Sequence, residues 1–275
     1  MLAKTKRRSK IKLKIENVYK TFNPGTINEK KALQGINLVL NDGDFITVIG
    51  GNGAGKSTML NMITGVYPVD SGKIEVDGID ITKKPDYKRA KYFGRVFQDP
   101  MMGTAADMQI EENLALALRR GKPRTLKPGI TSKERAMFKE ILATLDLGLE
   151  NRLTSKVGLL SGGQRQAITL LMATMQNPKL LMLDEHTAAL DPQTAAKVLK
   201  LTEKLVAQEK ITTLMITHNM KDAITYGNRL IMMNNGRIVF DVSGEEKSKL
   251  TIEELIQKFS ESGGDMPSDR SLLQN

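Results

Sequence analysis

Residues 50–57 are Gly50-Gly51-Asn52-Gly53-Ala54-Gly55-Lys56-Ser57, and Thr58 follows them directly. Glycines at this density let a backbone wrap closely around phosphate groups, while a lysine reaches the β- and γ-phosphates and a hydroxyl binds magnesium. A glycine-rich turn without a ligand is the alternative. The apolar residues 45–49 predict a strand before the loop, and residues 57–63 predict a helix after it that ends at Gly65. This strand, loop and helix favour a phosphate-binding loop.

Alternating apolar and polar residues predict a β-rich start of the sequence. Ile11, Leu13 and Ile15 show the pattern, and residues 36–40 repeat it. Further strands are expected at residues 73–77, 93–97, 180–183 and 211–217, and a hairpin at Asn235-Gly236. A helix expected at residues 193–208 lies between two of these strands. Strands that alternate with helices predict an α/β fold with a parallel sheet.

The middle of the chain is predicted to be helical. Apolar residues recur at helical spacing over 110–118 and 132–147, and Pro123, Pro128 and Gly129 separate the two helices. We therefore expect a helical insert at about 99–165 within a single domain of residues 11–260. Residues 1–10 form a basic arm, and the polar, aperiodic residues 261–275 are expected to be a flexible tail.

A second glycine motif, Leu160-Ser161-Gly162-Gly163-Gln164, precedes a helix expected at 166–176. Such a turn offers unpaired backbone N–H groups and the positive end of the helix dipole to an anion. A plain loop is the alternative. The turn is half of a site, because another segment must hold the phosphate.

Two carboxylates, Asp184 and Glu185, follow the apolar strand expected at 180–183. Ligand groups in α/β sheets gather at the carboxyl ends of strands. Asp184 can hold magnesium there, and Glu185 can orient a water in line with the γ-phosphate or take its proton. A solvated acidic turn is the alternative, but the phosphate loop in the same chain favours the functional interpretation.

His218 and Gln98 also follow predicted strands, and they fall on the same sheet edge as Asp184. There an imidazole could contact the γ-phosphate or the attacking water, and an amide could join the magnesium shell. A lone histidine is more often structural. Asp191 precedes a proline, so it would also serve simply to begin a helix.

The composition excludes several classes of protein. The 275 residues contain no cysteine and only two histidines, so disulfides, thiolate metal sites and zinc chemistry are not expected. No apolar run approaches the roughly 18 residues of a membrane span, and the start lacks the apolar segment of a signal peptide. We therefore expect a cytoplasmic protein.

The net charge of +10 is concentrated at the start of the sequence. The first 14 residues contain no acid and these cations: Lys4, Lys6, Arg7, Arg8, Lys10, Lys12 and Lys14. Such an arm could contact anionic lipid or nucleic acid, but a solvated tail leading into a strand is the commoner case. No nucleic-acid partner is expected.

Taken together, these motifs resemble those of the ATP-binding-cassette (ABC) ATPases in order and approximate spacing. The resemblance covers about residues 11–242. It implies an ABC-type P-loop ATPase fold, with a mixed or parallel sheet core, an antiparallel β subdomain and an inserted helical subdomain. It also implies ATP and Mg²⁺ as ligands.

The resemblance assigns roles to individual residues. The ATP-binding residues would be Gly50, Gly51, Asn52, Gly53, Ala54, Gly55, Lys56, Ser57 and Thr58. Those of the catalytic step would be Glu185 as general base, His218 as switch histidine and Gln98 as lid glutamine. The metal would be held by Ser57, Gln98 and, through water, Asp184. The ATP of a second subunit would be contacted by Ser161, Gly162, Gly163 and Gln164, and Asp191 would belong to the D-loop.

Two positions keep alternatives open. The aromatic that stacks on adenine in this family corresponds to Phe22, with Tyr19 as the second candidate, and either could instead be a packing aromatic. His186 stands directly after Glu185, where the family usually has proline. A harmless lineage variant is favoured there over tuning of the turn.

The resemblance also implies an assembly. Two copies would form a homodimer around two ATP molecules and work with a separate transmembrane permease and a solute-binding protein. The chain would then lie peripherally on the inner face of the cell membrane. The permease would dock near Gln98 and the helical insert, although the apolar residues Met101, Met102, Met108 and Leu114 of the insert could equally be packed core.

Residues 97–100, 111–114 and 184–191 are similar to those of bacterial importer ATPases linked to amino acids. The alternative is a soluble ABC ATPase that acts on nucleic acid or ribosomes. Those proteins usually carry two cassettes or long coiled-coil or zinc insertions, and none is visible here. A cassette that only binds nucleotide would lack Lys56 or Glu185, and both are present.

Overall fold

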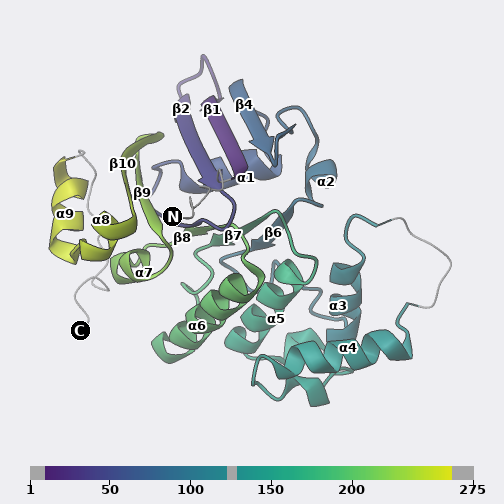
Figure 1. The fold of residues 1–275 in the computed structure, drawn as a ribbon. Helices are drawn as coiled ribbons and strands as arrows, with labels where there is room; N and C mark the ends of the chain where they lie inside the picture. The colour runs from purple at the N-terminus through teal and green to yellow at the C-terminus, as the bar shows by residue number, and fades with distance from the viewer. Residues whose placement is uncertain (1–9, 123–128, 262–275) are drawn as a thin grey trace, which may run out of the picture.

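The structure, a computed structural model, describes residues 10–122 and 129–261. The basic arm expected at 1–10 lies outside the described residues apart from Lys10, and the tail expected at 261–275 lies outside them apart from Glu261. Pro123 and Pro128 also lie outside them. The described residues form two sheets and several helices, arranged in layers (Figure 1).

A six-stranded sheet forms the centre of the fold, in the order β10-β9-β3-β8-β7-β6. Its strands are β3 (Phe45–Ile49), β6 (Phe93–Val96), β7 (Leu180–Asp184), β8 (Thr213–Ile216), β9 (Arg229–Asn234) and β10 (Arg237–Ser243). Adjacent strands are parallel except β9 and β10, which form the hairpin expected at Asn235-Gly236. The carboxyl ends of β3, β6, β7 and β8 therefore meet at one edge of the sheet. The predicted α/β fold with a mixed, mainly parallel core is confirmed.

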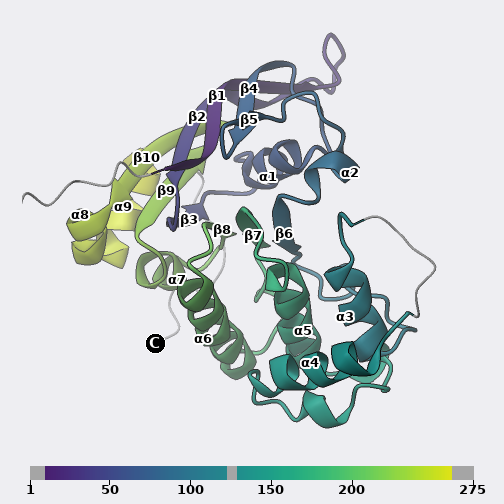
Figure 2. The ribbon, with the colours of Figure 1, turned by 45° about the vertical axis from the view of Figure 1, so that its right-hand side comes forward.

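A second sheet of four antiparallel strands, in the order β2-β1-β4-β5, forms the upper layer in Figure 2. It consists of β1 (Ile11–Phe22), β2 (Lys30–Asn41), β4 (Ser71–Val76) and β5 (Ile79–Asp80). Helix α1 (Lys56–Thr64) lies between the two sheets, since one buried cluster contains Leu13 of β1, Leu60 of α1 and Leu214 of β8. Packing on both sides holds α1, and with it the glycine loop that leads into the helix.

The carboxyl end of α1 is closed by Gly65 and Arg89. Gly65 has a φ of 89°, in the left-handed region that glycine adopts without strain. Arg89, at the end of α2 (Asp86–Arg89), is buried and donates to the backbone oxygens of Met62 at 2.7 Å and Ile63 at 3.0 Å. These bonds satisfy carbonyls that have no partner within the helix.

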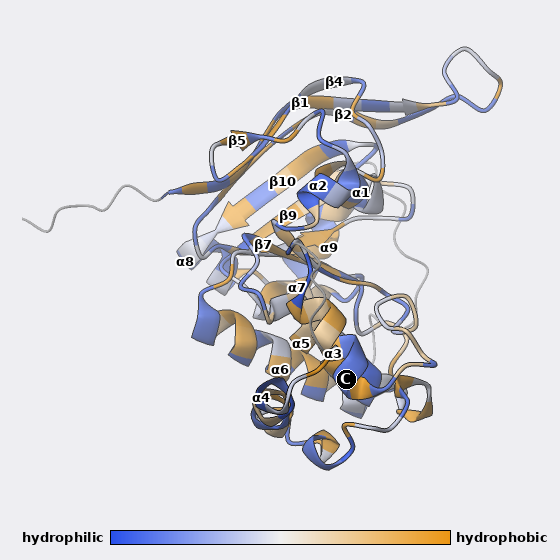
Figure 3. Ribbon diagram, turned by 90° about the vertical axis from the view of Figure 1, so that its right-hand side faces the viewer, coloured by the Kyte–Doolittle hydropathy of each residue, from blue (hydrophilic) through white to orange (hydrophobic). Residues whose placement is uncertain are grey.

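Helices cover the other face of the six-stranded sheet (Figure 1). They are α5 (Gly162–Thr174) and α6 (Pro192–Glu209), while α7 (Met220–Thr225), α8 (Gly244–Lys249) and α9 (Ile252–Glu261) pack near β9 and β10. Leu170 of α5 and Leu199 of α6 join one buried cluster with Leu181 of β7. Along α6, hydrophilic residues accompany the hydrophobic ones (Figure 3), as expected of a helix with one face on a sheet. None of the helices in the described part of the chain is long and apolar enough to cross a membrane.

A helical unit lies between β6 and β7 in the sequence. It contains α3 (Ile110–Leu118), α4 (Ser132–Ala143) and two short 3₁₀ helices, η1 (Leu149–Asn151) and η2 (Val157–Leu159). Leu114, Phe138 and Ile168 form part of its separate core. The helix expected at 132–147 ends earlier than predicted, and the helix expected at 166–176 begins four residues earlier, at Gly162.

Candidate functional site

The glycine loop connects β3 to α1, as the sequence predicts. The buried ammonium of Lys56 donates to the backbone oxygens of Gly50 at 2.7 Å and Gly51 at 3.1 Å, so the loop is folded around this side chain. Burial lowers the pKa of Lys56, and the charges of Glu185 and Asp184 oppose that effect. The loop therefore presents a cation next to the backbone N–H groups at the start of a helix, which is an environment suited to phosphate.

Gly55 is required where the loop enters α1. Its φ of 102° is one that side chains rarely adopt, and a Cβ there would lie 2.7 Å from the backbone oxygen of Ala32 and 2.8 Å from Leu33 Cδ2. Any larger residue would have to displace β2 or the helix. The close approach of α1 to β2 thus explains why glycine occupies this position.

Glu185 and His218 meet at the same sheet edge. Glu185 directly follows β7, and its N–H donates to the backbone oxygen of Ile216 on β8 at 3.0 Å. His218 lies just beyond β8, and its Nε2 is 2.6 Å from Glu185 Oε1. Both line a cavity of about 230 Å³, and the other lining residues are Asn52, Gly53, Ala54, Gly55, Lys56, Ser57 and Thr58. The structure thus brings together the expected base, the expected switch histidine and the phosphate loop.

Asp184 and Gln98 line a second cavity, of about 590 Å³. Asp184 Oδ2 forms an ion pair with Arg95 Nη2 at 3.0 Å, a contact that no motif indicates. Gln98 follows β6, as predicted, and so lies beside the next strand, β7. Of the three groups expected to serve the metal, Gln98 and Asp184 share this cavity, while Ser57 lies on the phosphate-loop cavity.

The chemistry of these side chains suits Mg²⁺. Ser57, Gln98 and Asp184 offer a hydroxyl, an amide oxygen and a carboxylate, and Mg²⁺ prefers oxygen ligands. No group of three or more His, Cys, Asp or Glu side chains that could hold a metal occurs within residues 10–122 and 129–261. Mg²⁺ is commonly bound by one or two protein groups together with substrate phosphates and water, and the oxygen groups of Ser57, Gln98 and Asp184 fit that role.

Ser161 caps the amino end of α5. Its Oγ accepts from the Gln164 N–H at 3.3 Å, and Gln164 Oε1 accepts from the Ser161 N–H at 3.2 Å, which makes a capping box. Ser161, Gly163 and Gln164 line a cavity of about 490 Å³ that does not include the phosphate loop. Gly162 is exposed beside them. The structure therefore does not join the two glycine motifs within one chain.

Gly163 has a packing role that no motif indicates. A Cβ at this position would lie 2.2 Å from Thr194 Cγ2 on α6, far inside van der Waals contact. Asp191 begins that helix, since its side chain accepts from the Thr194 N–H at 3.1 Å. The helix-starting alternative for Asp191 is therefore correct, and it does not exclude a further role.

The two aromatic candidates have different surroundings. Phe22 ends β1, and its ring meets that of Tyr67 edge-on with centroids 5.2 Å apart. Tyr19 is half-exposed and packs its hydroxyl against Gly35. Both rings therefore have packing partners. Lys30, the strand partner of Phe22, reaches Gly53 of the phosphate loop, a neighbour that no motif indicates.

His186 is a buried side chain. Only 2 % of it is exposed, and its Nε2 lies 3.2 Å from Thr202 Oγ1 on α6. Thr202 donates to the backbone oxygen of Val198, so it accepts from the histidine Nε2–H. Burial lowers the pKa of His186 to about 4. His186, as a neutral imidazole, therefore links the turn after β7 to α6 by a hydrogen bond.

Comparison with known proteins places this geometry in a family. The sequence model described as "ABC transporter" matches residues 33–188, more than half of the chain. The chain belongs to the ABC transporter ATPase family. It is 46 % identical over 248 residues to a tyrosine transport ATP-binding protein of Clostridioides difficile, covering 90 % of this chain and 98 % of that protein. It is 32 % identical to an energy-coupling factor transporter ATP-binding protein, EcfA2, of Clostridium acetobutylicum, covering 94 % and 92 % of the two chains.

Solved structures agree with the family. The ADP conformation of the ATP-binding cassette MJ1267 matches with a TM-score of 0.74 at 31 % identity, covering 91 % of this chain and 98 % of that one. A dimeric post-hydrolysis state of the cassette MJ0796, bound to ADP and phosphate, matches with a TM-score of 0.70 at 29 % identity, covering 84 % and 98 %. The predicted fold is confirmed, and the ABC protein is an ATPase that binds ATP.

Proposed function

We propose that this ABC ATPase is the ATP-hydrolysing subunit of a bacterial importer and that two copies close around two ATP molecules. The observation that carries the proposal is the contact of Glu185 with His218 in the cavity formed by the phosphate loop. In that position a carboxylate can act as a base on the attacking water only when a phosphate is bound in the loop. The relatives named as transport proteins support the assignment to a transporter.

In this mechanism the phosphate loop binds and orients ATP. Lys56 exchanges the loop carbonyls for the β- and γ-phosphates, and Ser57 and Thr58 add their hydroxyls. Ser57, Gln98 and, through water, Asp184 would hold Mg²⁺, and its charge would neutralise that of the phosphates. Glu185 orients the attacking water and takes its proton, while His218 holds the Glu185 carboxylate in line.

The signature turn acts on the ATP of the second subunit. Ser161 is exposed at the amino end of α5, so its hydroxyl and the adjacent N–H groups are available to an anion that this chain does not hold itself. The dimeric MJ0796 cassette supports this arrangement. ATP then joins the two subunits, and loss of the γ-phosphate removes the contact that holds them closed.

A groove beside Gln98 is the proposed docking site of a separate permease. Two adjoining cavities of about 550 and 590 Å³ share Arg95, Phe97, Val66 and Met102, and we call them the Arg95 groove. Exposed apolar side chains line it: Val66, Tyr87, Met102 and Leu116. Of the residues that could equally have been core, Leu114 is fully buried and Met108 is half-buried, whereas Met101 and Met102 are exposed. Docking there would place the chain on the inner face of the cell membrane.

The name of one relative supports a proposal for the cargo. The protein of C. difficile is named for tyrosine transport, so we propose an amino acid as the solute, delivered by a solute-binding protein to the permease. Residues 11–260 would form one ATPase domain, with the helical insert at about 99–165.

The transport role can be tested by copurification. Copurification of the chain with a multi-span membrane protein would support a transporter subunit, whereas ATPase stimulation by nucleic acid or ribosomes would favour a soluble ABC ATPase.

The hydrolytic role is tested by phosphate release. Glu185→Gln should slow turnover by roughly 10²- to 10⁴-fold, the contribution of a general base. ATP affinity, measured by displacement of a fluorescent nucleotide, should stay within a few-fold of the wild type. Near-normal turnover in this variant would show that Glu185 is not the base.

A further inference from the structure

Arg95 joins three elements that surround the proposed metal site. It lies on β6, and its Nη2 contacts Asp184 Oδ2 on β7 at 3.0 Å. Its Nη1 donates to Asn61 Oδ1 on α1 at 2.8 Å. The two paired side chains are only 16 % and 14 % exposed, so solvent screens the Arg95–Asp184 pair weakly.

These contacts occupy groups that a bound metal would use or adjoin. Asn61 stands one turn after Ser57 on α1, so both project from the same face of that helix. Asp184 shares its cavity with Gln98. The guanidinium therefore neutralises the proposed metal-site carboxylate from the side of the groove.

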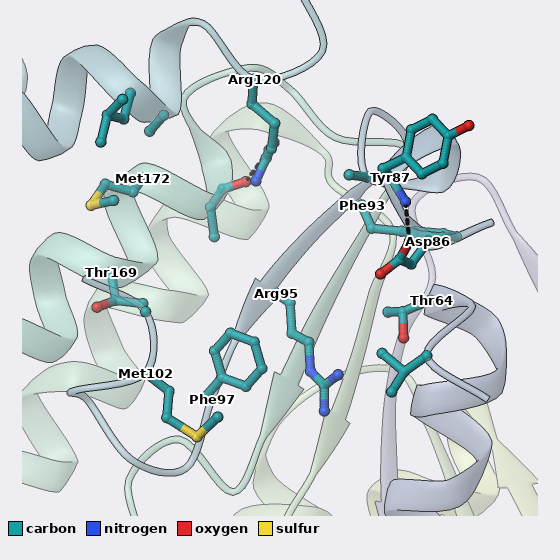
Figure 4. Close-up of a pocket in the computed structure, with 16 residues that line it drawn as sticks. Thr64, Asp86, Tyr87, Phe93, Arg95, Phe97, Met102, Arg120, Thr169 and Met172 are labelled. Atoms are coloured by element: carbon teal, nitrogen blue, oxygen red, sulfur yellow. Dashed lines mark hydrogen bonds between the residues drawn. The ribbon is translucent and has the colours of Figure 1, made fainter. Parts of the chain in front are cut away.

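Arg95 also has room to change partners. Within the described residues its buried Nε has no hydrogen-bond partner, which leaves one donor unsatisfied. Its Cζ lies 4.6 Å from the centroid of the Phe97 ring. This cation–π contact would stabilise the guanidinium when it is not paired with Asp184. Figure 4 shows Arg95 beside Phe97 in the groove, with Met102 near one side and Thr64 on the other.

We propose that Arg95 is a positioning residue that holds Asp184 in the metal-free chain and releases this carboxylate when Mg²⁺ binds together with ATP. The inference rests on the proposed function, because it requires Asp184 to serve the metal. A guanidinium and Mg²⁺ are like charges, so each lowers the affinity of Asp184 for the other. Arg95 thus weakens binding of Mg·ATP while favouring ATP that comes without the metal.

The test compares nucleotide affinity with and without metal. The dissociation constant of a non-hydrolysable ATP analogue is measured in EDTA and in excess Mg²⁺, and the ratio of the two values gives the gain from the metal. Arg95→Gln should raise this ratio by about threefold to tenfold, as expected when one charge is removed a few Å from the metal. Arg95→Met, which retains the packing against Phe97, should do the same. Hydrolysis plays no part in this measurement.

Two controls separate charge from general damage. Arg95→Lys keeps the charge and should leave the ratio near the wild-type value. Arg119→Gln removes a cation that pairs with Glu134 at 2.8 Å on the helical unit, and it should leave the ratio unchanged. A ratio unchanged or lowered in both Arg95→Gln and Arg95→Met overturns the inference, as does equal behaviour of the Lys and Gln variants. Failure of the wild type to bind the analogue would instead overturn the proposed function.

Discussion

Glu185 Oε1 and His218 Nε2 lie 2.6 Å apart in a cavity formed with the phosphate loop. The contact exists because β7 and β8 are parallel neighbours, so the residues that follow them emerge at the same edge. Glu185 has a φ of 48°, a left-handed conformation that is uncommon for a residue with a side chain. The contact therefore forms at a turn whose backbone has an uncommon conformation.

His218→Ala should lower turnover by roughly 10²-fold, the scale of losing one preorganised polar contact to the reacting groups. ATP affinity should change little, because Lys56 and the loop backbone remain in place. Single-turnover phosphate release and a binding titration separate the two effects. A rise in the dissociation constant that accounts for the whole loss would assign His218 to binding instead of hydrolysis.

Ser161→Ala should damage hydrolysis much more than nucleotide binding by the isolated monomer. The variant also loses a helix cap, which costs about 1 kcal/mol of stability. Thr131→Ala is the matched control, because Thr131 forms the same kind of capping box with Glu134 at the start of α4, away from the phosphate loop. If both variants lose the same fraction of turnover, Ser161 acts as a cap alone.

Gly163→Ala should destabilise the fold by about 1–3 kcal/mol, the usual cost of overpacking. The added Cβ would meet Thr194 Cγ2 at 2.2 Å. Thr194→Ser removes that methyl group and keeps the N–H that Asp191 caps, so the double variant should recover most of the loss in urea denaturation. Additive losses in the double variant would disprove this packing account.

His186 should make stability depend on pH in the acid range. Its pKa is about 4 in the folded chain and roughly 6.5 in an unfolded one, so unfolding takes up a proton between these values. This contribution to stability is fully present above about pH 6.5 and is lost as the pH falls towards the folded value. The wild type should therefore lose about 2 kcal/mol more than His186→Gln between pH 7 and pH 5, as measured by urea unfolding. Parallel pH profiles of the two proteins would contradict this.

Much of the site was predictable because its groups belong to local motifs at strand ends. Asp184 ends a strand, and the phosphate loop, Glu185, Gln98 and His218 each follow one. Parallel strands bring such residues to one edge of the sheet. The amino end of α5 could also have been predicted from the sequence. Ser161 and Gln164 have the spacing of a capping box, which begins the helix at Gly162 instead of residue 166.

The remaining features depend on side chains that meet across elements. Arg95 on β6 contacts Asp184 on the neighbouring strand and Asn61 on the helix between the sheets. No spacing in the sequence predicts these contacts. The approach of Thr194 to Gly163 depends on how closely α6 packs on α5. Burial of His186 likewise follows from the position of α6, so its departure from the family pattern could not be explained beforehand.

The assembly can be tested most directly by the molar mass of Glu185→Gln in the presence of ATP and Mg²⁺, measured by light scattering. Since this variant should retain ATP, the account predicts a dimer of twice the 30.4 kDa chain. The same protein should be monomeric without nucleotide, and Ser161→Ala in the same background should weaken the dimer. A protein saturated with ATP that remains a monomer at high concentration would contradict the account.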